Sequence, residues 1–154
     1  MNKVSKLLYN ICDKGSNVLY KHKWLYWLLS FTWGIIGTVL GFVMMMCVHM
    51  VGGEIGFYHK HMMITFGDNW GGLECGIGFI CDKTASNYCK NHECGHNYQN
   101  AILGPFAIIL SYIPSIIRYH YRNIQEKKGK KLTTAYDDIW FEKSASDIGN
   151  KLYK

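Results

Sequence analysis

The sequence predicts a mainly helical membrane protein that contains one small β-hairpin. Three observations support this prediction. Residues 24–51 form a run of 28 residues without Asp, Glu, Lys or Arg, and about 20 apolar residues are enough for a helix to cross a bilayer. Short strand-like runs follow between residues 58 and 81. Helical patterning then returns around the H-E-x-x-H sequence at residues 92–96 and again at about residues 135–148.

The basic segment of residues 1–23 precedes the apolar run and carries five lysines against one aspartate. Trp24, Tyr26 and Trp27 begin the apolar run and suit the headgroup boundary of a bilayer. A signal peptide is disfavoured, because the run exceeds the ~7–15 apolar residues of such a leader and no clear small-residue cleavage site follows. We therefore expect residues 24–51 to be a transmembrane helix. The expected location is integral to the cell membrane, with the lipid bilayer as a partner.

Residues 58–81 are predicted to form β structure. The runs at residues 62–66 and 77–80 are short and strand-like, and glycine-rich stretches at residues 67–69 and 71–72 separate them. A hairpin just ahead of the H-E-x-x-H segment would offer an edge strand that can hold an extended peptide. It would equally serve as a lid over the following helix.

The H-E-x-x-H sequence places His92, Glu93 and His96 at the spacing of a zinc hydrolase. On a helix, His92 and His96 lie one turn apart on the same face, while Glu93 points aside towards a metal-bound water. Neutral imidazoles are good zinc ligands, zinc lowers the pKa of its bound water towards ~7, and a nearby carboxylate can accept the proton. This spacing therefore predicts a Zn²⁺-dependent hydrolysis, without naming its substrate.

A zinc site of this kind needs a third protein ligand, and Glu142 is the best candidate. It lies in the predicted helix at about residues 135–148, before a stop signal at Gly149-Asn150. Ala145 and Ser146 follow on the same face, and their small side chains would let another helix approach closely. A solvated carboxylate on an amphipathic helix fits the same pattern.

The order of these and other blocks resembles a group of small, largely uncharacterised bacterial membrane proteins. The matching blocks are Thr32-Trp33-Gly34, His92-Glu93-Cys94-Gly95-His96-Asn97-Tyr98-Gln99, Leu103-Gly104-Pro105, Pro114-Ser115 and Phe141-Glu142-Lys143-Ser144-Ala145. By that resemblance the chain is similar to gluzincin metallopeptidases, and residues 52–154 form the metallopeptidase-like region. The resemblance implies that His92, His96 and Glu142 hold zinc, that Glu93 is the general base, and that a peptide or protein is the substrate.

One departure from that pattern concerns the groups that support the ligands. The chain reads Ala145-Ser146-Asp147 where the resembling proteins tend to have Ala-Asp. A shift of one residue rotates a helical side chain by about 100°, so Asp147 does not simply inherit the role. Gln99 lies on the His92/His96 face and is a second candidate for holding a ligand or substrate, or else a helix-packing amide.

A second apolar segment, residues 101–117, is interrupted by Gly104-Pro105 and by Pro114. Basic residues at both ends of the chain favour two membrane crossings. Two crossings would, however, place Glu142 across the bilayer from His92 and His96, too far for a metal bond of ~2 Å. Either this segment is a kinked, re-entrant or interfacial pair of short helices, or the site lies inside the membrane boundary. We expect the first, because the Pro and Gly positions give a physical cause for a bend.

Four cysteines cluster in the middle of the chain, namely Cys75, Cys81, Cys89 and Cys94. They permit disulfides in an oxidising space, and they also permit a rival metal site. Cys89, His92 and His96 share one helical stripe, so Cys89 is an alternative metal ligand that another cysteine, His59 or His61 would complete. The competing functional prediction is thus a non-catalytic membrane protein with a structural zinc site, or a degenerate metallopeptidase.

The basic run at residues 127–131 adjoins an apolar segment. Anionic lipid headgroups explain it better than nucleic acid, because no nucleic-acid-binding motif accompanies it. The net charge of +6 needs no polyanionic partner once the basic flanks are counted. We therefore predict no nucleic-acid partner.

Overall fold

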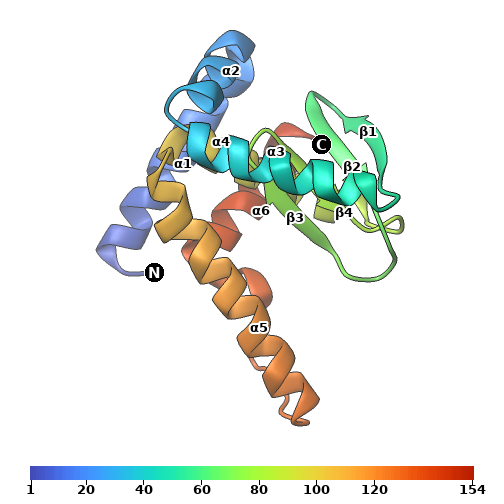
Figure 1. The fold of residues 1–154 in the computed structure, drawn as a ribbon. Helices are drawn as coiled ribbons and strands as arrows, with labels where there is room; N and C mark the ends of the chain where they lie inside the picture. Colours follow the sequence, from blue (N-terminus) through green and yellow to red (C-terminus); the bar gives the residue numbers. More distant parts are fainter.

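The structure is a computed structural model that describes residues 1–154. It contains six α-helices and one four-stranded sheet (Figure 1). The helices are α1 (Lys3–Lys21), α2 (Lys23–Phe31), α3 (Ile35–Met50), α4 (Asn87–Leu103), α5 (Ile113–Lys127) and α6 (Trp140–Leu152), with short helical segments η1 (Ile108–Tyr112) and η2 (Tyr136–Asp138). The strands are β1 (Glu54–Tyr58), β2 (His61–Thr65), β3 (Gly72–Cys75) and β4 (Gly78–Cys81). The predicted fold class, a mainly α membrane protein with a hairpin, is wrong, because the fold is α/β.

The apolar run of residues 24–51 is two helices, α2 and α3, bent by 86° relative to each other. The break falls at residues 32–34, where the Thr32 hydroxyl donates to the Leu28 carbonyl at 2.7 Å. The Trp33 indole donates to the Ile102 carbonyl at 3.1 Å and so ties the bend to the end of α4. No helix of the structure has both the length and the apolar character that a membrane crossing requires. The bent pair of α2 and α3 has them only when its two helices are taken together. The predicted single transmembrane helix is therefore wrong, since apolar content does not record a change of chain direction.

The sheet has the strand order β1-β2-β4-β3. Strand β2 pairs antiparallel with β1 and parallel with β4, and β3 pairs antiparallel with β4. The predicted hairpin is wrong, because its two expected strands, at residues 62–66 and 77–80, lie side by side as the parallel neighbours β2 and β4. Each has a separate antiparallel partner that sequence patterning missed. Strand β3 is consequently an edge strand of the sheet.

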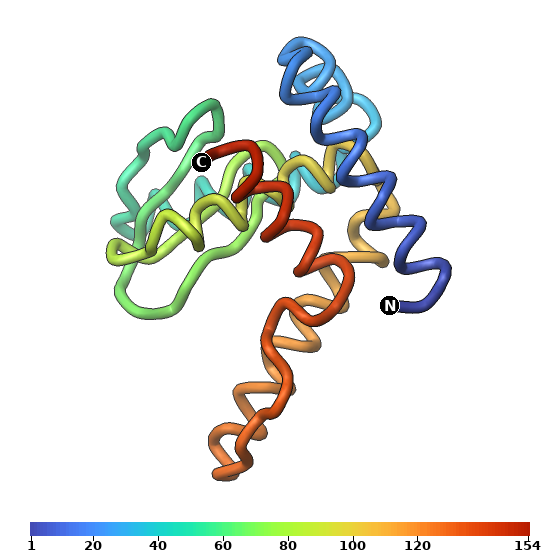
Figure 2. Tube along the Cα trace, turned by 180° about the vertical axis from the view of Figure 1, so that it is seen from behind, coloured from blue at the N-terminus to red at the C-terminus, as the bar shows by residue number.

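Helix α4 is the central helix, and all of residues 93–101 are buried. Helices α1 and α6 pack against it, and all three contribute to the main apolar core. Figure 2 shows α6 passing between α1 and the sheet side of the molecule. Polar residues placed on α4 therefore lie inside the protein, where each needs a partner.

The segment of residues 101–117 changes direction after α4 ends. Gly104 has a φ of +58° and packs against the Trp33 ring, where any side chain at position 104 would collide. The π-helical turn η1 follows, and Pro114 lies in the first turn of α5. Helix α5 then projects from the rest of the molecule as an arm, and the chain returns alongside it to α6 (Figures 1 and 2). This return brings the start of α6 back to α4.

Candidate metal centre

Helix α4 positions the two histidines of the H-E-x-x-H sequence. Its first turn is capped by Ser86, whose hydroxyl accepts from the Cys89 amide at 3.2 Å. The helix continues without a break to Leu103, so His92 and His96 lie one turn apart. Their rings lie 4.7 Å apart, centroid to centroid, at an interplanar angle of 86°. The predicted helical placement of the two imidazoles on one face is therefore present.

Two glycines let α6 approach α4 closely enough to bring Glu142 to the histidines. A Cβ atom on Gly95 would overlap the Ala145 carbonyl of α6, and one on Gly149 would overlap the Asn91 carbonyl of α4. Both helices therefore contact each other through backbone atoms. The sequence analysis assigned this close approach to the small side chains of Ala145 and Ser146. It also placed the end of the helix at Gly149, whereas α6 continues to Leu152.

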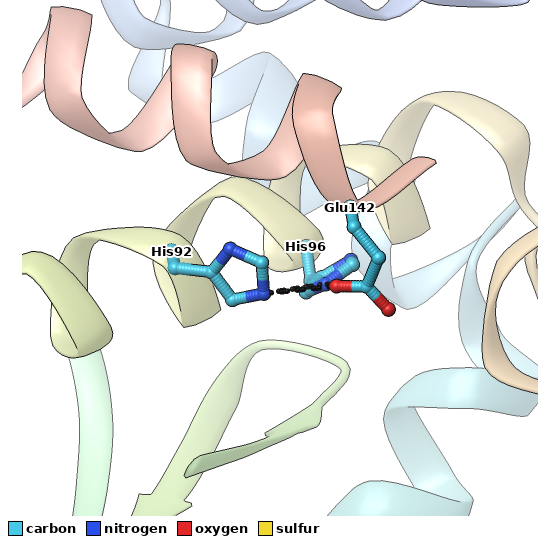
Figure 3. A group of neighbouring side chains, drawn as sticks. All are labelled: His92, His96 and Glu142. Atoms are coloured by element: carbon cyan, nitrogen blue, oxygen red, sulfur yellow. Dashed lines mark hydrogen bonds and ion pairs between the residues drawn. The ribbon is translucent and has the colours of Figure 1, made fainter. Parts of the chain in front are cut away.

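Three side-chain donor atoms from the two helices converge on one point (Figure 3). The Nε2 atoms of His92 and His96 lie 3.1 Å apart, and they lie 3.1 and 3.3 Å, respectively, from Oε2 of Glu142. Ligands of a tetrahedral zinc ion, with metal bonds of 2.0–2.1 Å, are separated by about 3.3 Å. Two imidazoles and one carboxylate are also a common catalytic zinc donor set. The geometry and the chemistry of these three groups fit a zinc ion.

Hydrogen bonds at the opposite ring nitrogen fix the tautomer of His96. The Gln99 amide nitrogen donates to the Phe141 carbonyl at 2.8 Å, so its oxygen faces Nδ1 of His96, also at 2.8 Å. Nδ1 must therefore carry the proton, which leaves the lone pair of neutral His96 on Nε2, directed at the shared point. Gln99, a predicted candidate for holding a ligand, thus orients His96.

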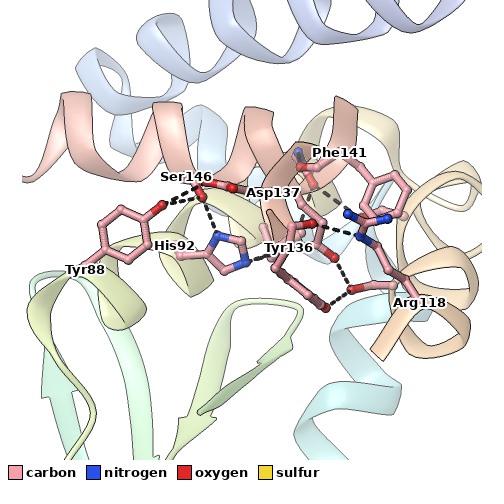
Figure 4. A network of polar contacts seen from close by, with 12 residues as sticks. Tyr88, His92, Arg118, Tyr136, Asp137, Phe141 and Ser146 are labelled. Atoms are coloured by element: carbon pink, nitrogen blue, oxygen red, sulfur yellow. Dashed lines mark hydrogen bonds and ion pairs between the residues drawn. The ribbon is translucent and has the colours of Figure 1, made fainter. Parts of the chain in front are cut away.

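The other two candidate ligands are also held by hydrogen bonds, and Figure 4 shows the one between His92 and Ser146. His92 Nδ1 lies 2.9 Å from the hydroxyl of Ser146, which also accepts a hydrogen bond from Tyr88. Oε1 of Glu142 accepts a hydrogen bond from Ser115, whose hydroxyl lies 3.2 Å from that of Tyr136. Partners of this kind set the orientation of metal ligands. Ser115 is one residue that the spacing argument missed, although it belongs to the Pro-Ser block of the resemblance.

The electrostatics of the centre favour a positive charge between the three groups. Burial alone would raise the pKa of the Glu142 carboxyl, but hydrogen bonds from His92 and His96 hold it well below its usual range. Burial alone would likewise lower the pKa of His96, yet the hydrogen bond and charge of Glu142 raise it to about 9. A bound cation would replace the proton that these groups otherwise share.

The Glu93 carboxylate is 5 % exposed and lines the same cavity as the two histidines. It packs against Gly72 at the start of β3, where a Cβ atom would collide with the carboxylate. Burial raises the pKa of the Glu93 carboxyl, while His92 and His96 oppose that rise. A carboxyl whose pKa is raised towards neutrality is suited to accept and return a proton.

The cavity in front of the three ligands has a volume of about 780 Å³. Strand β3 lines it together with aromatic and apolar side chains from α5, such as Tyr119 and Ile116. Glu74 of β3 also lines it, and its carboxylate accepts hydrogen bonds from Tyr112 and from the Gly76 amide. Burial raises the pKa of Glu74 to about 7. No sequence signal pointed to Glu74, because a single glutamate in a glycine-rich strand has no distinctive spacing.

Other predicted site residues lie apart from the centre. Asp147 accepts hydrogen bonds from Tyr9 and Lys143 on the outer side of α6. Cys89 lines the cavity, but it is not among the three residues whose donor atoms meet. All six cysteines are free thiols.

Comparison of the chain with protein-family models, curated proteins and solved structures gave no match. The gluzincin resemblance therefore stays a prediction, and so do the peptide substrate, the lipid partner and the membrane location. Any functional inference must depend on the geometry of the residues themselves.

Proposed function

We propose that this protein is a zinc metallopeptidase whose metal ligands are His92, His96 and Glu142. The observation that carries the proposal is the convergence of two Nε2 atoms and one carboxylate oxygen within 3.1–3.3 Å of one another. Gln99 and Ser146 hold Nδ1 of the two histidines, so both Nε2 atoms face Oε2 of Glu142. A zinc ion that replaced the shared proton would bind the same three atoms.

The chain supplies the residues for hydrolysis of a peptide bond. Bound zinc would polarise the substrate carbonyl and lower the pKa of the attacking water. Glu93 takes a proton from that water as its oxygen bonds to the carbonyl carbon, and then delivers the proton to the leaving nitrogen as the C–N bond breaks. Gln99 and Ser146 keep the two histidines in the orientation that ligand binding requires.

Strand β3 gives the cavity a means of holding a polypeptide. It is an edge strand, and Gly72, Leu73 and Glu74 of this strand line the cavity together with the metal ligands. An extended peptide can add to such an edge through main-chain hydrogen bonds. The aromatic and apolar lining, which includes Trp70 and Tyr119, favours substrates with bulky apolar side chains.

The competing proposal is a structural zinc site with Cys89 as a fourth ligand. Cys89 lines the same cavity, although its sulfur is not among the donor atoms that meet. This arrangement gives no role to Glu93, which lines the cavity beside the two histidines. Catalysis therefore accounts for more of the site than a structural role does.

The test is turnover of a quenched fluorescent peptide library by the zinc-loaded protein. Glu93→Gln keeps the shape of the side chain but removes the base, so we expect at least a 1,000-fold loss of turnover, on the order of general-base contributions, with zinc content unchanged. Glu54→Gln is the matched control, because Glu54 pairs with Lys83 on the exposed surface. Equal activity in Glu93→Gln and the unaltered chain, or no cleavage by the zinc-loaded chain, would contradict the proposal.

A further inference from the structure

Lys60 carries a buried ammonium group that makes no hydrogen bond within the protein. It lies in the tight turn between β1 and β2. Its Nζ atom lies 4.6 Å from the ring centroid of Tyr26, 4.8 Å from that of Tyr98 and 5.5 Å from that of Tyr20. An ammonium group has three N–H donors, and a buried donor is normally paired.

The three rings do not satisfy this ammonium fully. Ring faces attract a cation, but they do not replace oxygen acceptors for its N–H groups. Burial, together with the nearby charge of Lys23 and against an opposing effect of Cys94, lowers the pKa of Lys60 to about 8. Lys60 therefore still carries a charge at neutral pH, without an anionic partner in the protein.

A second cavity, of about 360 Å³, adjoins Lys60. Its lining is Tyr20, Lys23, His59, Lys60 and Tyr153, so it contains two lysines and no acidic residue. Lys23 is also the first residue of α2.

The lining of this cavity is held in place by the C-terminal end of the chain. Figure 2 shows that end beside the β1–β2 hairpin. The His59 ring stacks on the Tyr153 ring at a centroid distance of 4.3 Å, and the Tyr153 hydroxyl lies 2.8 Å from Nε2 of His61. His59 itself has a φ of +53°, as the first residue of a two-residue turn between antiparallel strands requires.

We propose that this cavity binds a small anion, bearing a phosphate or a carboxylate group, through Lys60 and Lys23. Rotation of the Lys60 side chain towards the cavity brings its buried Nζ to the anion. The anion then supplies the oxygen acceptors that Lys60 lacks, and it offsets the repulsion between the two lysines. The proposal does not depend on the metal centre, because the two cavities share no lining residue. A failure of one proposal therefore leaves the other in place.

The test is thermal unfolding and calorimetric titration with sodium phosphate, sodium acetate and sodium chloride at matched ionic strength. We expect a saturable rise in Tm with phosphate or acetate beyond the chloride control, and the more effective anion identifies the group that the cavity prefers. Lys60→Met removes the ammonium but keeps most of the length of the side chain, and it should weaken anion binding at least tenfold. Lys23→Gln should weaken it by a smaller factor and serves if Lys60→Met fails to fold.

Lys127→Gln is the control, because Lys127 is exposed at the end of α5, outside the cavity. It should bind the anion as the unaltered chain does. A rise in Tm that matches chloride, or one that persists in both Lys60→Met and Lys23→Gln, would overturn the proposal and leave Lys60 as a purely structural cation over three aromatic rings.

Discussion

The protein buries histidines in two places, and the two environments shift the histidine pKa in opposite directions. His61 is fully buried, with Nε2 at 2.8 Å from the Tyr153 hydroxyl and Nδ1 at 2.9 Å from the Asn97 amide. Burial lowers the pKa of His61 to about 3. His96 is almost as deeply buried, yet Glu142 raises its pKa to about 9 against the effect of burial.

The difference shows what separates a structural histidine from a candidate ligand. Both ring nitrogens of His61 are used by neutral partners in the core, so no lone pair faces a cavity. His92 and His96 each use Nδ1 for a neutral partner and direct Nε2 at a carboxylate beside a cavity. Both sites are buried, so burial does not distinguish them. A candidate ligand differs from the structural histidine in having one ring nitrogen that faces a carboxylate beside a cavity.

The largest expected effect comes from separating the helices that carry the metal centre. Gly149→Ala introduces a Cβ atom against the Asn91 carbonyl, where backbone rather than a flexible side chain must move. We expect a loss of about 3 kcal/mol in the free energy of unfolding, at the upper end of overpacking costs, together with loss of zinc. Denaturant unfolding and elemental analysis measure both. Gly56→Ala, which meets only the end of the Met63 side chain, is the control.

Replacing the structural histidine should affect stability without affecting the metal. His61→Phe keeps the volume roughly but leaves Asn97 and Tyr153 without their buried partner. We expect a loss of about 2 kcal/mol in the free energy of unfolding, as for an unsatisfied buried polar group, and an unchanged zinc content. Loss of zinc in a folded His61→Phe protein would remove the distinction between the two histidine environments.

The two environments should also respond differently to pH. The pKa of His61 falls from 6.5 to about 3 on folding, so below pH 6.5 the unfolded chain binds a proton that the folded chain does not. His61 therefore stabilises the fold fully above pH 6.5, and this stability is lost by about 1.4 kcal/mol per pH unit as the pH falls towards 3. Denaturant unfolding between pH 7 and pH 4 should show a steeper decline for the unaltered chain than for His61→Phe. Parallel declines would contradict the assignment.

The smallest expected effect concerns the hydroxyl that orients His92. Ser146→Ala removes the partner at 2.9 Å from Nδ1, and loss of such a partner weakens metal binding by about 10-fold. Ser144→Ala is a close control, because Ser144 lies on the same helix with a buried hydroxyl that makes no hydrogen bond. Competition with a chromogenic zinc chelator measures both affinities. Equal affinities would mean that Ser146 does not orient the ligand.

Local spacing predicted the helical placement of the two histidines, which the structure shows. His92, Glu93 and His96 belong to one helix, so the 3.6-residue period fixes how they lie relative to each other. Glu142 was named from its block of residues, and the structure brings it to the two histidines through the contacts at Gly95 and Gly149. Those contacts join residues far apart in the sequence, so no local sequence pattern predicts them.

The same limit explains why the fold class was mispredicted. Apolar content extends unbroken across residues 24–51, while the bend depends on the Trp33 bond to the distant Ile102 carbonyl. The strand runs at residues 62–66 and 77–80 were recognised, but their parallel pairing depends on β1 and β3 taking the outer positions of the sheet. The pattern of apolar and polar residues along the chain identifies individual helices and strands. How these helices and strands pair is decided by tertiary contacts, which that pattern does not contain.

The most direct test of the metal centre is the zinc content of the purified, zinc-reconstituted protein by elemental analysis. The comparison includes the unaltered chain, Glu142→Ala, His92→Ala and Cys89→Ala. Our account predicts about one zinc ion per chain in the unaltered protein and in Cys89→Ala, as expected for a single His₂Glu site, and a substantial loss in the other two variants. Zinc that persists in Glu142→Ala but disappears in Cys89→Ala, or no zinc in the unaltered chain after reconstitution, would contradict it.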